Sequence, residues 1–194
     1  MFTVNKATIS GEVTSLKEGK NLLLAVTQNV HGMETTFEVF VPEDIKDSIS
    51  FSEGDNILIR NAICYEKNGR RFKVETPTQL ERYSGPSFNN HSFTGMVKAY
   101  RQVGDTKNII IEISQDVAGK IPTSFNLFCP PSLQEEFLRR TPMEPGDYVE
   151  VIGAILYEKE GEFRYKAEAK DIGILYYKDY NKGDINAEFL KKGE

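Results

Sequence analysis

The sequence is poor in the residues that build metal sites and disulfide frameworks. Its 194 residues include two cysteines, two histidines and no tryptophan. Cys64 and Cys129 lie in apolar segments that do not match each other, so free buried thiols in a reducing interior are expected rather than a disulfide. Scattered single His and Cys residues also argue against a structural zinc site. We therefore expect no metal and no other cofactor.

Long apolar runs and catalytic motifs are lacking as well. No apolar run approaches about 18 residues and the N-terminus shows no signal-peptide core, which predicts a soluble, cytoplasmic protein without a membrane partner. The P-loop, zinc-protease and nucleophile-elbow motifs do not occur. His31 and His91 stand alone in the sequence, and the carboxylates fall at predicted helix starts and turns. The sequence predicts that the protein is not an enzyme.

What the chain does contain is an internal repeat. Residues 54–69, GDNILIRNAICYEKNG, return at 146–161 as GDYVEVIGAILYEKEG, and flanking segments match in the same order. The spacing of about 92 residues is that of a whole small domain rather than of a solenoid unit. The chain is therefore expected to hold two copies of one fold, each large enough to bury a modest core.

Each copy has the pattern of five short strands with a helix between the third and the fourth. This order predicts an all-β protein with short helices, built as two tandem OB-fold five-stranded Greek-key barrels. Small residues inside the fourth strand, Asn61 and Gly153, mark the place where a barrel strand bends sharply. The predicted division is a first barrel at 1–83, a linker at 84–91, a second barrel at 92–180 and a C-terminal tail or short helix at 181–194.

Several segments resemble bacterial single-stranded DNA-binding proteins. They are the opening Asn5-Lys6-x-x-Ile9-x-Gly11, the strand Thr36-Phe37-Glu38-Val39-Phe40, and Gly54-x-x-Ile57-x-Ile59 before a long hairpin. The tandem arrangement is similar to that of the two-domain members of the family, which pair as dimers and so present four OB domains. The resemblance implies a homodimer that binds single-stranded DNA.

The chain departs from that family in two features. The usual stacking tryptophans are absent, and the chain ends INAEFLKKGE rather than in a Gly/Pro-rich tail with an acidic tip. Recruitment of replication or repair proteins through such a tail is therefore in doubt. Both losses fit a divergent protein of a phage or mobile element.

Binding of single strands without sequence preference requires cations for the phosphates and aromatic faces for the bases. The hairpin of the first copy offers both and holds only one acid, Glu66, whereas the charged residues within 43–55 are five acids and one lysine. The alternative is an ordinary solvated hairpin. The predicted nucleic-acid contacts of this hairpin are Arg60, Tyr65, Lys67, Arg70, Arg71, Phe72 and Lys73.

The second copy places its basic groups differently. Its hairpin mixes acids and bases almost evenly, while the region between its first two strands is basic. Both loops flank the oligonucleotide groove of an OB-fold. The alternative is that the second barrel serves dimerisation or another interaction. Its predicted contacts are Lys98, Tyr100, Arg101, Lys107, Tyr157, Lys159, Arg164 and Lys166.

The third strand of each copy supplies a stacking candidate. Alternation places Phe37 inside the first barrel and Phe40 outside, and the same parity places Phe128 outside the second barrel. The alternative for Phe40 is packing beneath the helix that follows Pro42. Tyr65 and Tyr157 end the fourth strands, where each either stacks a base or closes the end of its barrel.

Together these patterns predict sequence-independent binding of single-stranded DNA in replication, recombination or repair, by a homodimer. Two alternatives stay open: an OB-fold adaptor that holds a replication or repair protein, and a protein that binds single-stranded RNA. The net charge of −5 and the missing tryptophans favour the adaptor. The basic hairpin and the outward phenylalanines favour DNA.

Overall fold

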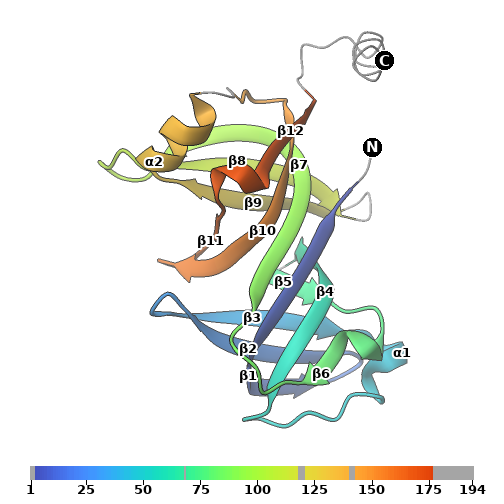
Figure 1. Cartoon of the computed structure of the whole chain (residues 1–194). Coiled ribbons are helices and arrows are strands. Elements are labelled where there is room, and N and C mark those ends of the chain that lie inside the picture. Colours follow the sequence, from blue (N-terminus) through green and yellow to red (C-terminus); the bar gives the residue numbers. More distant parts are fainter. Residues whose placement is uncertain (1–2, 68, 118–120, 140–142, 177–194) are drawn as a thin grey trace, which may run out of the picture.

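Two β-barrels form the computed structural model, which describes residues 3–67, 69–117, 121–139 and 143–176 (Figure 1). The predicted tail at 181–194 lies outside these residues. Among them, no helix is long and apolar enough to cross a membrane.

The first barrel is a five-stranded OB-fold. Its strands pair in the order β1-β2-β3-β5-β4, and β4 returns to pair with β1, which closes the barrel. The pairing of β3 with β5 is parallel, as the Greek-key path of an OB-fold requires. The short strand β6 pairs with β4 outside this ring. The elements are β1 (Asn5–Glu18), β2 (Leu22–Val30), β3 (Met33–Val41), α1 (Glu43–Lys46), β4 (Asn56–Glu66), β5 (Arg70–Lys73), η1 (Pro77–Gln79) and β6 (Leu80–Arg82).

The second barrel repeats this order. Its strands pair as β7-β8-β9-β11-β10, β10 returns to β7, and β12 pairs with β10 as β6 does with β4. The predicted fold, two tandem OB barrels with short helices, is confirmed by this order. The elements are β7 (Asn89–Gln102), β8 (Ile109–Val117), β9 (Ile121–Cys129), α2 (Pro131–Leu133), η2 (Gln134–Leu138), β10 (Tyr148–Lys159), β11 (Glu162–Lys166), η3 (Ala169–Asp171) and β12 (Ile172–Tyr176).

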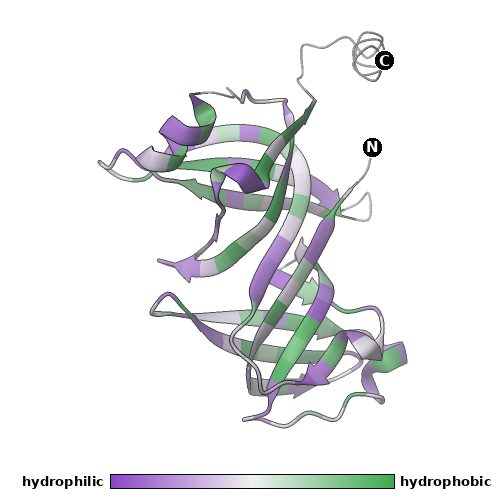
Figure 2. Cartoon of the chain, viewed as in Figure 1, coloured by the Kyte–Doolittle hydropathy of each residue, from purple (hydrophilic) through white to green (hydrophobic). Residues whose placement is uncertain are grey.

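Alternation along the strands explains why these segments close into barrels. In β3, Phe37, Val39 and Val41 are fully buried while Thr36 and Glu38 are exposed. Polar and apolar bands alternate in the same way along most strands in Figure 2. Successive side chains of a strand point to opposite faces, so one face of each sheet is left for the barrel core and the other for the surface.

Glycine and a left-handed residue shape both barrels at matching positions. A Cβ on Gly11 would lie 2.6 Å from the Thr27 carbonyl oxygen, and one on Gly95 would lie 2.6 Å from that of Ser114. Only glycine allows β1 and β7 to pass so close to the next strand. The bend predicted within the fourth strand is also present, because Asn61 and Gly153 both have positive φ, at 52° and 68°.

The two barrels are joined through a pseudo-twofold interface. Strands β1 and β7 pair antiparallel, with Asn5 opposite Phe93 and Ile9 opposite Asn89, so the pairing is symmetric about Ala7 and His91 (Figure 1). Residues 89–91, part of the predicted linker, therefore belong to strand β7. The reason is that the strand is extended by pairing with the other barrel, which a local reading of SGPSFNNH does not reveal.

Side chains across this interface obey the same symmetry. Asn5 Nδ2 donates to Gln115 Oε1 (3.0 Å), and Asn89 Nδ2 donates to Gln28 Oε1 (3.0 Å). Each of these asparagines also holds the backbone of the fourth strand in its own barrel. The contacts have the isologous form of a symmetric dimer, although both partners lie in one chain.

A buried polar cluster breaks the symmetry at the axis. His91 Nδ1 lies 2.9 Å from the Tyr165 hydroxyl, and His91 Nε2 lies 3.1 Å from Asn5 Oδ1. Arg70 Nη1 donates to the Tyr165 hydroxyl at 3.0 Å. Burial first, and then the charge of Arg70, lowers the pKa of His91 to about 3. A neutral imidazole that donates to Asn5 and accepts from Tyr165 satisfies the cluster.

Candidate nucleic-acid interface

A row of side chains crosses the outer face of the first barrel. On adjacent strands, Lys17 lies opposite Leu23 and Leu23 lies opposite Phe40. Phe40 in turn lies beside Lys73 of β5. Phe40 is partly exposed whereas Phe37 is fully buried, which confirms the parity predicted for this strand. An aromatic ring and an aliphatic side chain are thus flanked by cations on one open face.

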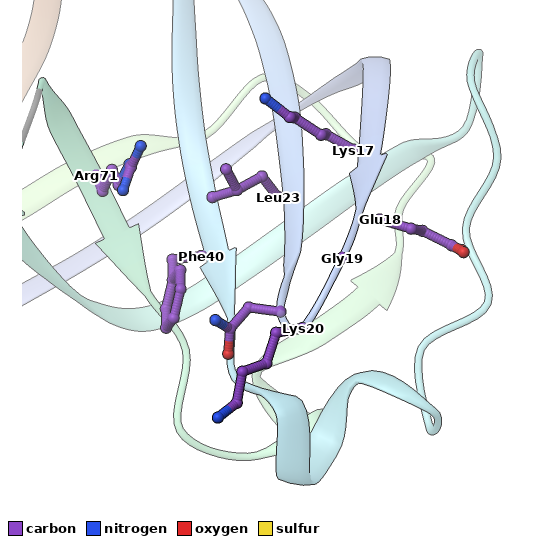
Figure 3. A pocket seen from close by; sticks show the side chains of 8 residues that line it. Lys17, Glu18, Gly19, Lys20, Leu23, Phe40 and Arg71 are labelled. Carbon is purple, nitrogen blue, oxygen red and sulfur yellow. The ribbon is translucent and has the colours of Figure 1, made fainter.

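Three members of the row, Lys17, Leu23 and Phe40, line a shallow groove of about 270 Å³. The turn between β1 and β2 lies on one side of this groove, and Arg71 lies on the other (Figure 3). In an OB-fold, this face and this loop are the places where oligonucleotides bind. The groove is lined by Lys17, Glu18, Gly19, Lys20, Asn21, Leu23, Phe40 and Arg71.

Tyr65 supports the ring of Phe40 from the side. The two rings meet edge to face, with centroids 6.5 Å apart and planes at 87°. Tyr65 is only 8% exposed, and burial raises the pKa of its phenol. A side chain so buried offers little face to a base. Tyr65 therefore packs against Phe40 at the end of the barrel, the second of the two roles considered for it.

The cations of this groove are held loosely. Arg71 Nε donates to Glu38 Oε2 at 2.9 Å, and Lys20 Nζ lies 3.5 Å from Glu43 Oε2. Lys17 of the groove, and Lys67 of the hairpin outside it, are exposed and have no ion pair within the part of the chain that the structure describes. Exposed ion pairs contribute only about 0–1 kcal/mol, so these cations can exchange their carboxylates for phosphates.

Two residues of the hairpin that are predicted to contact nucleic acid are buried. Phe72 is fully buried in the core of the first barrel, and Arg70 is only 6% exposed. Arg70 lies between the barrels, where it donates to Tyr165 and to the Ser124 carbonyl oxygen. The prediction that these two side chains meet nucleic acid is wrong, because Phe72 points into the core of its own barrel and Arg70 packs against the second barrel.

Arg60 and Lys73, two further cations of the first barrel that are predicted to contact nucleic acid, each lie beside an acid. Arg60 pairs with Glu81 on β6, and Lys73 Nζ lies 3.6 Å from Glu75. Arg60 is on β4, whereas the row of aromatic and basic side chains crosses β1, β2, β3 and β5. Of the two, Lys73 belongs to the row and Arg60 does not.

The second barrel repeats the row, with an arginine that is paired with Glu162. Arg101, Ile110 and Phe128 lie opposite one another in the same register as Lys17, Leu23 and Phe40. Phe128 is partly exposed, as predicted, but Tyr157 and Arg164 are buried. The remaining predicted cations of this barrel are exposed: Lys98, Lys107, Lys159 and Lys166.

Tyr100 has a structural role. Its hydroxyl donates to the Met143 carbonyl oxygen at 2.6 Å, and burial, followed by the nearby charge of Asp147, raises its pKa to about 12. This hydrogen bond therefore links β7 to the segment before β10. This role competes with the predicted contact to nucleic acid.

Six of the eight lining residues are not among the predicted contacts: Lys17, Glu18, Gly19, Lys20, Asn21 and Leu23. Residues 17–21 lie at the end of β1 and in the loop to β2, whereas the predicted contacts of this barrel lie on β3, β4, β5 and the turn between β4 and β5. The OB-fold order already indicates that this loop flanks the groove. Leu23 gave no signal, because it follows an ordinary apolar strand pattern.

Comparisons with known proteins add little. No protein-family model and no curated protein matches the chain. Among solved structures, it is similar to fission yeast Pot1 with ssDNA at 11% identity and a TM-score of 0.34, covering 98% of this chain and 90% of that one. A murine DNA-binding protein bound to double-stranded DNA matches at 10% identity and a TM-score of 0.34, covering 92% and 97%.

A third match has the same low level of similarity. A replication protein A heterotrimer bound to ssDNA matches at 11% identity and a TM-score of 0.31, covering 99% of this chain and 53% of that one. The fold of this chain is identified by its own strand order, described above.

Proposed function

We propose that the chain binds single-stranded DNA, without sequence preference, in the groove of the first barrel. The observation that carries this proposal is the row of Lys17, Leu23, Phe40 and Lys73 across the outer face of a closed OB barrel. Bases would stack on Phe40 beside Leu23, and phosphates would meet Lys17, Lys20 and Arg71. Stacking is sequence-tolerant because every base has a π-face.

The groove favours nucleic acid over a small metabolite or an enzyme substrate. It is open and shallow, and its walls combine an aromatic ring with cations rather than with paired catalytic groups. No cluster of three His, Cys, Asp or Glu side chains that could hold a metal ion occurs among the described residues. Roles in replication, recombination or repair, and the likeness to the bacterial single-stranded DNA-binding proteins, belong to the same proposal.

Fluorescence titration with labelled dT and rU oligomers tests the proposal. Binding of dT should weaken as salt rises, with a log–log slope of about −0.7 per phosphate contact. Replacing Lys17 and Lys20 together with Ala should flatten this slope by about 1.4 on the same rule.

Lys170→Ala is the matched control. Lys170 lies 2.7 Å from Glu168 and outside the groove, so its loss should leave the slope unchanged. A chain that prefers rU would redirect the proposal to RNA, and a chain that binds neither oligomer would overturn it.

A further inference from the structure

The second barrel carries a carboxylate at the centre of the face that corresponds to the groove. Glu162 Oε1 accepts a hydrogen bond from Asn126 Nδ2 at 2.9 Å and another from Arg101 Nη2. Glu162 Oε2 accepts from Arg164 Nε at 3.0 Å, with Arg164 Nη2 at 2.9 Å. One acid therefore binds the two arginines that stand on the same face as Phe128.

The first barrel has no such acid at the matching position. The strand registers match Arg101 with Lys17 and Arg164 with Arg71. Glu162 pairs with Lys159, and its counterpart beside Lys67 in the first hairpin is Gly69. Lys17 has no ion pair within the described residues, and Arg71 reaches a half-exposed partner, Glu38. In the second barrel one acid thus holds both arginines of the face, whereas in the first barrel Arg71 is paired with Glu38 and Lys17 has no ion pair among the described residues.

The surroundings of Glu162 would also suit a phosphate. Arg164 Nε and Nη2 both lie near Glu162 Oε2, and Glu162 Oε1 accepts from Arg101 and Asn126, so each anionic oxygen meets donors that could equally bind phosphate oxygens. Here the Arg164 side chain is only 5% exposed and Glu162 is 26% exposed. A phosphate that entered this face would have to displace Glu162 and would meet its negative charge on the way.

We propose that Glu162 closes a second, latent single-strand site on the second barrel by occupying the place of a phosphate. This inference rests on the proposed function, because it takes the groove of the first barrel as the open form of the same site. It assigns Phe128, Arg101 and Arg164 to the latent site. The chain then binds a single strand on only one of its two barrels, and Glu162 determines which barrel that is.

Titration of the Glu162→Gln variant with a dT oligomer of about eight nucleotides tests this inference, since one OB-fold covers about 4–16 nucleotides. The amide keeps the size of the side chain and removes the charge. The wild type should bind one oligomer per chain and the variant two. The second event should lose affinity with salt at a slope of about −1.4, for the two released arginines.

Glu160→Gln is the matched control. Glu160 is 74% exposed and lies 3.8 Å from Arg164, so this variant makes the same change in net charge without opening the face. It should still bind one oligomer per chain. Adding Phe128→Ala to Glu162→Gln should abolish the second event, which separates a stacking site from a general gain in positive charge.

The outcomes separate this inference from the proposed function. One oligomer per chain for both the wild type and Glu162→Gln would overturn the latent site and leave the proposed function intact. Two oligomers per wild-type chain would also overturn it, because the second barrel would then already be open. A wild type that binds none, beside a Glu162→Gln variant that binds one, would overturn the proposed function and support the latent site.

Discussion

At the scale of single residues, strand parity separates the two phenylalanines of β3. Phe37 is fully buried and meets the Phe72 ring edge to face at 5.7 Å, while Phe40 lies on the outer face. The same residue type on one strand therefore serves the core at one position and the groove at another. Local sequence is enough to tell them apart, because alternation on a strand fixes the face to which each side chain points.

This separation predicts opposite phenotypes. Phe40→Ala should weaken dT binding by about 1–3 kcal/mol, or roughly five- to over a hundredfold, with a melting temperature close to that of the wild type. Phe37→Ala should cost about 3–5 kcal/mol of folding stability. Thermal melting and titration of both variants measure these effects.

Phe128→Ala is the control from the second barrel. It removes an equivalent ring from the face that Glu162 closes, so the affinity for dT should stay near that of the wild type. A Phe40→Ala chain that melts far lower but binds normally would show that this ring is structural and would remove it from the proposed site.

At the scale of elements, the two adjacent arginines of the β4–β5 hairpin have different roles. Arg70 points into the interface and stacks against Phe163, with its guanidinium carbon 5.6 Å from the ring centroid. Arg71 points to the groove. Adjacent residues of a strand face opposite sides, so one hairpin both joins the barrels and lines the binding face.

These different roles predict different effects for the two Arg→Ala variants. Arg71→Ala should reduce the salt slope of dT binding by about 0.7 and change the free energy of unfolding by about 0.5 kcal/mol or less. Arg70→Ala should leave the slope unchanged but lower stability by about 2 kcal/mol, because Tyr165 and the Ser124 carbonyl lose a charged donor. Urea unfolding and salt-dependent titration check both. An Arg70→Ala chain of normal stability with a flatter slope would contradict this division.

At the scale of the whole molecule, the interface between the barrels has the form of a dimer interface within one chain. Reciprocal Asn–Gln contacts and the β1–β7 pairing join the halves. The predicted homodimer would therefore need a different surface. Ile152 on β10 and Leu175 on β12 are large apolar side chains that are exposed outside this interface. A second copy of the chain or a partner protein could contact them, so the homodimer and the adaptor remain predictions.

The interface also predicts how stability depends on pH. The pKa of His91 is about 3 in the folded chain and about 6.5 when unfolded, so only the unfolded chain takes up the proton between these values. Stability should therefore fall as the pH drops below about 6.5. Between pH 7 and pH 5.5, the loss assigned to His91 should be about 1 kcal/mol by linkage.

Urea unfolding at both pH values measures this loss. The His91→Ala variant, which copies the Ala7 of the first barrel, should be less stable at pH 7 but should lack this part of the pH dependence. His31→Asn changes the other histidine, which lies exposed in a turn, and should keep the dependence of the wild type. Equal pH dependence in wild type and His91→Ala would contradict the role given to His91.

The sequence by itself determined the repeat, the OB-fold and the outward placement of Phe40 and Phe128. These features follow from strand order and from alternation, which are local properties of the chain. The strand bends at Asn61 and Gly153 could also be predicted from the sequence, because the backbone conformation that a bend requires is a local property.

The tertiary structure alone decided which hairpin cations are free. Arg70 belongs to a hairpin with the composition of a binding element, yet it is buried between the barrels, because the hairpin packs against a strand more than fifty residues away. The same holds for Glu162, whose two arginine partners come from different strands. Contacts between distant segments depend on how the barrels close and dock, which the local patterns of the sequence do not reveal.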